Sequence, residues 1–180
     1  RAGTKRREAE RIGRKSFRRE DRAGIVTRPR ETALYTGGMT TVVVAGSSSR
    51  AGKTALVETV LRGLGGHAAA VKFTTTDDVF ERCPRGTACI VCDIDVPFKV
   101  VRDKATLHET GTDTARLAAA TTGPVLWTIA RKGVAALAWE ATLRLLEQAG
   151  AEAKTGARQD LVVEGSTVAS LCSPDFTFFV

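Results

Sequence analysis

Short apolar runs and longer segments with helical spacing alternate along this chain. The apolar runs, each bounded by polar or small residues, predict buried strands over residues 40–45, 68–73, 124–130, 160–165 and 176–180. Between them, apolar residues recur at helical spacing over residues 53–64, 111–120 and 134–150, which predicts helices. Strands that alternate with helices in this way predict a three-layer α/β/α sandwich with a mostly parallel sheet.

The loop between the first predicted strand and the first predicted helix is built from small and polar residues and ends in Gly52-Lys53-Thr54. A strand, such a loop, Gly-Lys-Thr and a helix, in that order, are the context of a phosphate-binding loop, or Walker A motif. Backbone N–H groups of the loop and of the helix start surround a polyphosphate in such motifs. The residues expected to bind nucleotide are Ser48, Ser49, Arg50, Ala51, Gly52, Lys53, Thr54 and Ala55.

Two residues of this loop have specific expected roles. Lys53 would reach the β- and γ-phosphates as a catalytic cation, and the Thr54 hydroxyl would bind Mg²⁺. The strict Walker A pattern has glycine where Ser47 stands, and Gly46 lies one residue earlier. Ser47 can serve only if the first turn of the loop needs no positive φ there. The alternative interpretation is a Ser- and Gly-rich turn before an ordinary helix.

Further charged residues lie where predicted strands end, which is the edge at which parallel sheets bind ligands. Glu164 follows Leu161–Val163 as the acid of a Walker B strand would, and it is expected to bind Mg²⁺ or to orient an attacking water. Lys72 is expected to close the second strand beside the phosphate site. Asp77 follows in a polar loop and would complete the Mg²⁺ shell as a catalytic residue. The alternatives are an edge acid at Glu164 and a solvated loop around Asp77.

The cysteines suggest a second metal site. Cys83, Cys89 and Cys92 lie close together in an irregular insertion over residues 79–107. Together with Cys172, His108 or an external ligand, they are candidates for binding Zn²⁺ or an iron–sulfur cluster. Neither a secretory start nor a membrane span is visible, so a cytoplasmic location with reduced thiols is expected. The spacing matches no standard zinc ribbon, so free thiols on a loop are the alternative.

Positive charge is concentrated at the start of the chain. Residues 1–30 hold 12 of the 27 Lys and Arg side chains and 4 of the 20 acidic ones, so the formal charge of +7 is local. Residues 1–38 are expected to form a disordered basic leader, or to lie upstream of the true start near Met39. The leader lacks the aromatic interleaving that base stacking uses, so a nucleic-acid partner is not expected. The domain is assigned to residues 39–180, and continuation past Val180 is left open.

An ordered set of motifs resembles MobB, the molybdopterin-guanine dinucleotide biosynthesis protein B family. The set comprises the phosphate loop, Val71-Lys72, Gly111-Thr112-Asp113-Thr114 at a helix start, and Val163-Glu164-Gly165. The resemblance covers residues 40–180 and implies a P-loop NTPase fold, in the class that includes dethiobiotin synthetase. It also implies that Lys72 and Asp113 contact the nucleotide and that Glu164 is the Walker B acid.

By this resemblance the protein binds GTP with Mg²⁺, hydrolyses it weakly and acts as a dimeric adaptor for an enzyme of molybdenum-cofactor biosynthesis. Two departures bear on the substrate. Residues 73–76 stand where the family has a His-containing motif, and the cysteine insertion is not typical of the family. The alternatives are an ATP-dependent small-molecule kinase or ligase that uses Lys72 and Asp77, and a metallocentre-assembly NTPase that uses the cysteines. No guanine-reading Asn/Thr-Lys-x-Asp motif is apparent, so the choice of GTP over ATP rests on the resemblance alone.

Overall fold

The computed structural model describes residues 39–48, 50–75, 96–152 and 159–180. The predictions that concern the leader, Ser49, Asp77 and the three clustered cysteines fall outside these residues. Cys172 is the one cysteine among the residues that are described.

A six-stranded sheet lies at the centre of the described structure, in the order β3-β4-β2-β5-β1-β6. β3 runs antiparallel to β4, and the other neighbouring pairs are parallel. The strands are Thr41–Ala45 (β1), Ala69–Thr75 (β2), Phe98–Val101 (β3), Val125–Ala130 (β4), Leu161–Glu164 (β5) and Phe176–Phe179 (β6). Because β5 lies between β1 and β2, the end of β5 lies between the loop that follows β1 and the end of β2.

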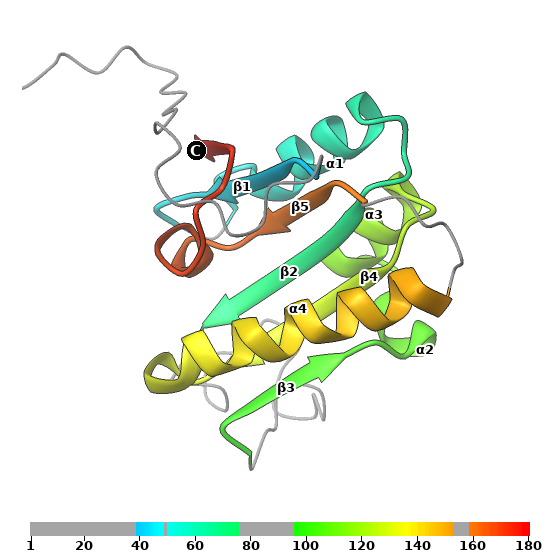
Figure 1. The fold of residues 1–180 in the computed structure, drawn as a ribbon. Helices are drawn as coiled ribbons and strands as arrows, with labels where there is room; N and C mark the ends of the chain where they lie inside the picture. Colours follow the sequence, from blue (N-terminus) through cyan, green and yellow to red (C-terminus); the bar gives the residue numbers. More distant parts are fainter. Residues whose placement is uncertain (1–38, 49, 76–95, 153–158) are drawn as a thin grey trace, which may run out of the picture.

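Helices cover both faces of this sheet (Figure 1). They are Lys53–Gly63 (α1), Lys104–Leu107 (α2), Asp113–Ala120 (α3) and Ala135–Glu152 (α4), with 3₁₀ turns at Lys132–Val134 (η1) and Thr167–Ser170 (η2). α1 and α3 contact each other on one face, and α4 packs on β3 and β4 on the other. The predicted α/β class with a mostly parallel sheet is therefore confirmed. Within the described ranges, no helix has the length and apolar character that crossing a membrane requires.

The central strands are buried on both faces, as their continuous apolar runs predict. Val43 and Val163 belong to the core cluster under α4, whereas Val44 and Val162 belong to the cluster under α1 and α3. Since side chains alternate along a strand, Glu164 falls on the same face as Val162. The acid that ends β5 is thereby directed to the α1 and α3 side of the sheet.

Two sequence predictions are corrected here. The segment 79–107 is not irregular throughout, because residues 98–101 form β3 and residues 104–107 form α2. Four residues are too few to show a strand period, and β3 forms because it pairs with the edge of β4. Lys72 does not close its strand either, because β2 continues to Thr75 by pairing with β4. The other predicted elements agree with the structure to within about two residues.

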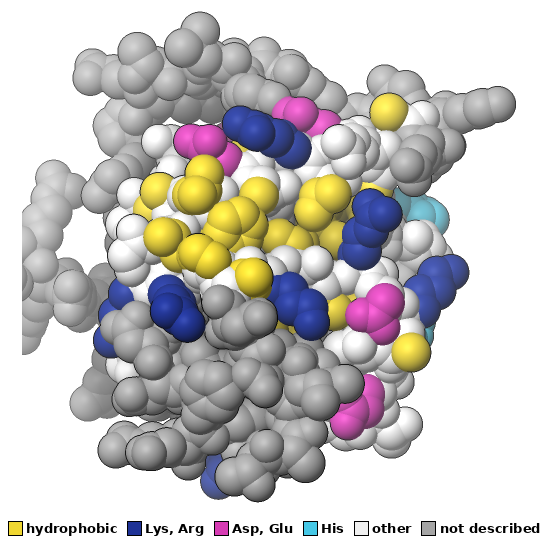
Figure 2. Space-filling model, turned by 90° about the horizontal axis from the view of Figure 1, so that it is seen from below, with side chains coloured by type: hydrophobic (Ala, Val, Ile, Leu, Met, Phe, Trp, Pro, Cys, Tyr) yellow, Lys and Arg dark blue, Asp and Glu magenta, His cyan; other side chains and the backbone are white. Residues whose placement is uncertain are grey.

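The face that carries β3 and α4 has a mixed surface. Viewed from below, it presents a strip of hydrophobic side chains bordered by Lys and Arg (Figure 2). Phe98 and Val100 of β3 are only partly buried against the core, and Leu137 of α4 is exposed. None of the charged residues predicted to bind phosphate belongs to β3 or α4, so this surface is distinct from the candidate site.

The packing of α3 can be tested at Leu117, whose side chain is 0% exposed. Leu117→Ala should lower the free energy of unfolding by about 2–5 kcal/mol, because it removes buried methylene groups and leaves a cavity. Urea unfolding measures this change. Leu137→Ala on α4, where the side chain is 55% exposed, is the matched control and should change stability by less than about 0.5 kcal/mol. Equal effects of the two substitutions would contradict the described packing.

Candidate functional site

The loop between β1 and α1 ends in a left-handed turn. Gly52 is the N-terminal cap residue of α1 and has φ 97°, and Arg50 also has positive φ, at 64°. Among the described residues, Arg50 is the one non-glycine residue with positive φ. Ser47 therefore meets the condition that the sequence set for it, because the backbone there requires no glycine.

The contacts of Gly46 explain why the glycine of the motif stands one residue earlier than in the strict pattern. A Cβ atom added to Gly46 would lie 2.7 Å from the carbonyl oxygen of Val180, so the close approach of the chain after β6 requires glycine. The Ser166 hydroxyl donates to the Gly46 carbonyl oxygen at 2.7 Å and accepts from the Gly46 N–H at 3.0 Å. The Ser47 N–H in turn donates to the Val180 carbonyl oxygen at 3.3 Å. The start of the loop is thus fixed by the segment after β5 and by the end of β6.

The start of α1 differs from the starts of α2 and α3. Thr112 caps α3 and Asp103 caps α2 with side-chain hydrogen bonds, whereas no side chain caps α1 within the described residues. The first N–H groups of an α-helix have no acceptor within the helix. The first N–H groups of α1 therefore lie at the end of the loop, and no described side chain caps them. The Lys53 ammonium group lies across the same loop and donates to the Ser48 carbonyl oxygen.

Four of the predicted site residues converge behind this loop. The Thr54 hydroxyl donates to Glu164 Oε2 at 2.9 Å, and Lys72 Nζ lies 3.4 Å from Glu164 Oε1. Lys72 also donates to Asp113 Oδ2. Lys72 and Glu164 are direct register partners on β2 and β5, so their side chains leave the sheet on the same face. The strand order brings Thr54, Lys72, Asp113 and Glu164 together from four separate elements.

The electrostatics of this cluster depend on burial. Glu164 is 5% exposed, and both of its carboxylate oxygens have a polar partner. Burial raises the pKa of Asp113, but hydrogen bonding and charge from Lys72, the nearby Thr54 hydroxyl and the charge of Arg116 outweigh it. The pKa of Asp113 therefore lies below its ordinary value. With two acidic side chains and one basic one, the cluster favours a cation.

The oxygen atoms of this cluster suit Mg²⁺. The Thr54 hydroxyl gives its single hydrogen to Glu164, so the lone pairs of its oxygen are left to accept or to coordinate. Mg²⁺ prefers hydroxyl, carboxylate and water oxygens and usually takes only one or two protein ligands. Thr54 and Glu164 supply such a pair where the loop meets α1.

Cys172 lies just after η2 and is half-buried. Its thiol donates to the Val168 carbonyl oxygen at 3.3 Å, and burial raises its pKa to about 11. The Cys172 thiol is therefore protonated at neutral pH in the described structure, and a metal ligand would have to be the thiolate. No group of three metal-ligating side chains occurs within the described residues. A site formed with Cys83, Cys89 and Cys92 stays a prediction, because those residues fall outside the described structure.

An open hollow of about 540 Å³ lies next to the phosphate loop. It is lined by residues of η2 and the segment around it: Ser166, Ala169, Ser170, Leu171, Cys172 and Ser173. Ser166 connects the hollow to the loop through its hydrogen bonds with Gly46. Sequence reasoning missed Ser166, although its place two residues after the Walker B acid is a usable signal.

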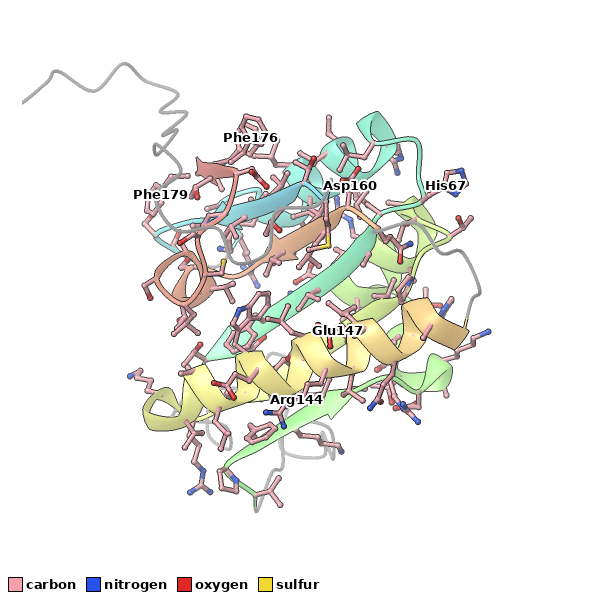
Figure 3. All side chains as sticks on the ribbon, in the orientation of Figure 1. His67, Arg144, Glu147, Asp160, Phe176 and Phe179 are labelled. Atoms are coloured by element: carbon pink, nitrogen blue, oxygen red, sulfur yellow. The ribbon has the colours of Figure 1, made fainter. Side chains whose placement is uncertain are left out.

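The opposite end of the sheet holds polar groups with structural roles. His67 and Asp160 lie at the amino ends of the strands, away from the phosphate loop (Figure 3). His67 Nδ1 is 2.9 Å from Thr122 Oγ1, and Asp160 accepts from the Thr40 N–H at 2.8 Å. These contacts connect loops at this end and give His67 and Asp160 structural roles.

Comparisons with protein families, curated proteins and solved structures find no match for this chain. The site is therefore interpreted from its own geometry and from the resemblance of its motifs.

The left-handed turn can be tested by substituting Gly52. Gly52→Ala should lower the free energy of unfolding by about 1–2 kcal/mol, because an added Cβ meets no atom within 4 Å and only the strain at φ 97° opposes it. Gly63→Ala at the end of α1 is the matched control and should stabilise by about 0.5–1 kcal/mol. Chemical unfolding of both variants measures the difference. A neutral Gly52→Ala would contradict the assigned turn.

The ion pair of Asp113 should make stability depend on pH in a defined direction. Because the folded-state pKa of Asp113 is lowered, its contribution is complete above the unfolded-state pKa of about 4 and is lost as pH falls through the folded-state pKa. Asp113→Asn should therefore cost up to about 1 kcal/mol at pH 7, since the side chain is 47% exposed, and progressively less below pH 4. Urea unfolding at several pH values measures the difference. A cost that grows on acidification would refute the assignment.

Proposed function

We propose that this chain binds a purine nucleoside triphosphate together with Mg²⁺ and hydrolyses it weakly. The observation that carries the proposal is the hydrogen bond between Thr54 and Glu164, located directly behind a small-residue loop and the uncapped start of α1. A phosphate loop followed by a hydroxyl residue that is paired with the acid of a neighbouring strand is the arrangement of P-loop NTPases.

The loop would hold the polyphosphate through its backbone. The unpaired N–H groups and the positive dipole end of α1 both favour an anion at that point. Lys53 would exchange its contact with the Ser48 carbonyl oxygen for a phosphate oxygen, which is a stronger, charge-assisted partner. The energy lost with the Ser48 contact is small compared with that gained on phosphate, so the apo position of Lys53 does not oppose binding.

Thr54 and Glu164 would hold Mg²⁺, which bridges phosphate oxygens and offsets their charge. Lys72 contacts both Glu164 and Asp113, and Lys72 and Asp113 would contact the terminal phosphate and its water shell. Lys72 orients the buried Glu164 carboxylate, and Asp113 keeps Lys72 in place. These side chains stabilise charge and supply little covalent chemistry, which suits a slow hydrolase.

The more specific form of the proposal comes from the resemblance to the MobB family. On that basis the nucleotide is GTP, the protein is a dimer, and its partner is an enzyme of molybdenum-cofactor biosynthesis. No guanine-reading residue supports GTP directly, so the base preference has to be measured.

A second candidate function is ATP-dependent phosphoryl transfer to a small molecule. The hollow lined by Ser166, Ser170 and Ser173 favours it, because Ser166 connects it to the loop and no charged side chain lines it. A neutral, hydroxylated acceptor fits such a lining. Transfer of labelled γ-phosphate to a compound other than water would support this candidate over simple hydrolysis.

Lys53→Met tests the phosphate loop. The substitution should weaken the binding of Mg²⁺·GTP and Mg²⁺·ATP by about 10- to 100-fold, because it removes a charge-assisted hydrogen bond worth about 1.5–3 kcal/mol. Calorimetric titration of wild type and variant with each nucleotide measures the loss and also gives the base preference.

The matched control is Lys99→Met on β3, which removes the same charge at an exposed position at the far edge of the sheet. It should bind nucleotide as the wild type does. If Lys53→Met retains full affinity, or if the wild type binds neither nucleotide, the assignment of the loop is wrong.

A further inference from the structure

An ion pair connects the two helices that deliver Thr54 and Asp113 to the site. Arg116 Nε donates to Glu58 Oε1 at 3.0 Å, and Arg116 Nη2 donates to Glu58 Oε2 at 2.8 Å. Two parallel hydrogen bonds between a guanidinium group and a carboxylate fix both the distance and the orientation of the partners. α1 and α3 are therefore joined by a bidentate contact as well as by their packed apolar faces.

This pair lies one helical turn behind the candidate site on both helices. Glu58 follows Thr54 by four residues on α1, and Arg116 follows Asp113 by three residues on α3. Residues at these spacings share one face of a helix. A rotation or a slide of either helix that broke the pair would also move Thr54 or Asp113 relative to Glu164.

The surroundings distinguish this pair from an ordinary surface ion pair. The Glu58 side chain is 14% exposed and that of Arg116 is 47% exposed, whereas Arg144 and Glu140 on α4 are 75% and 63% exposed and meet through one contact of 3.6 Å. The hydrogen bonds from Arg116 lower the pKa of Glu58. The same hydrogen bonds and the charge of Glu58 raise the pKa of Arg116. The two groups are thus charged together over the neutral pH range.

Glu58 also determines what Arg116 can do to the site. The charge of Arg116 also acts on Asp113 and Glu164, so the position of the guanidinium group affects the electrostatics of the site. Two of the five guanidinium N–H groups are donated to Glu58, and these two bonds fix where Arg116 lies, while Asp113 is bound by Lys72. Without Glu58, Arg116 loses the contact that fixes its position beside α1.

We propose that Glu58 and Arg116 are a positioning pair: they hold α1 and α3 so that Thr54 and Asp113 both face Glu164, and they thereby set the affinity for the Mg²⁺-bound nucleotide. The inference rests on the proposed nucleotide-binding function. The pair touches neither nucleotide nor metal and acts through Thr54 and Asp113.

The proposal separates two parts of nucleotide affinity. The loop amides and Lys53 are held by contacts with Ser166 and Val180 and by the start of α1, and none of these contacts involves α3, so phosphate binding by the loop does not depend on where α3 lies. The contribution of Mg²⁺ depends on Thr54, Glu164 and the groups beside them. Loss of the pair should therefore weaken binding in the presence of Mg²⁺ and leave Mg²⁺-free binding unchanged, a split that general destabilisation does not produce.

The test compares Glu58→Ala and Arg116→Gln with the wild-type chain. Fluorescent GTP and ATP analogues are titrated once with excess Mg²⁺ and once with EDTA. Each substitution should weaken binding about tenfold with Mg²⁺, which is the usual cost of disturbing groups that orient metal ligands, and less than about twofold with EDTA. Arg116→Lys keeps the charge but not the two parallel hydrogen bonds, so it should also lose affinity with Mg²⁺.

Glu140→Ala and Arg144→Gln are the matched controls, because they remove an ion pair on the opposite face of the sheet. Both should bind as the wild type does, and circular dichroism with urea unfolding checks that every variant is folded. Unchanged affinity in the Glu58 and Arg116 variants, full affinity in Arg116→Lys, or equal losses with and without Mg²⁺ would overturn the positioning role while the nucleotide-binding function stands. Absence of binding by the wild type would overturn both.

Discussion

The burial of Glu164 is the constraint on which the rest of the site depends. A carboxylate that is 5% exposed is tolerated only with close polar partners, since an unpaired buried charge costs several kcal/mol. Thr54 and Lys72 are those partners, and each comes from a different element. Satisfying this one group therefore requires that β5 lie between β1 and β2, that the loop end where α1 begins, and that Lys72 face the α1 side of the sheet.

The same requirement makes the site preorganised. The partners of Glu164 are in place in the apo chain, so a ligand does not have to bring them together. Lys72 is shared between Glu164 and Asp113, which connects the position of α3 to the buried acid. Ser166 connects the loop to the end of β5, because its hydroxyl binds both the N–H and the carbonyl oxygen of Gly46. Each part of the cluster thus has a second contact that fixes it.

The sequence predicted the α/β class and most elements, because apolar periodicity is a local signal. It predicted Thr54 from the loop motif and Lys72 and Glu164 from their places at strand ends, whereas Asp113 was predicted only through the resemblance to the MobB family. It could not predict the strand order, which depends on packing between distant segments. The position of Lys72 was misplaced because β2 is extended by pairing with β4. Ser166 and Arg116 were missed for a related reason: their partners, Gly46 and Glu58, lie 120 and 58 residues away in the chain. The predictions that concern Asp77 and the clustered cysteines remain predictions.

The two basic side chains near Glu164 lie at different distances from it, and this difference affects how a ligand would bind. Lys72 is in direct contact with the acids, whereas Arg116 lies one helical turn away and is occupied by Glu58. A cation that bound beside Thr54 would therefore repel the Lys72 ammonium group more than Arg116. Of its two acidic partners, Lys72 would then keep Asp113. A phosphate oxygen arriving with that cation offers Lys72 an alternative anionic partner. Lys72 would thus oppose the binding of a metal ion alone but not of a metal ion that arrives with phosphate. This would favour the joint binding of metal ion and phosphate.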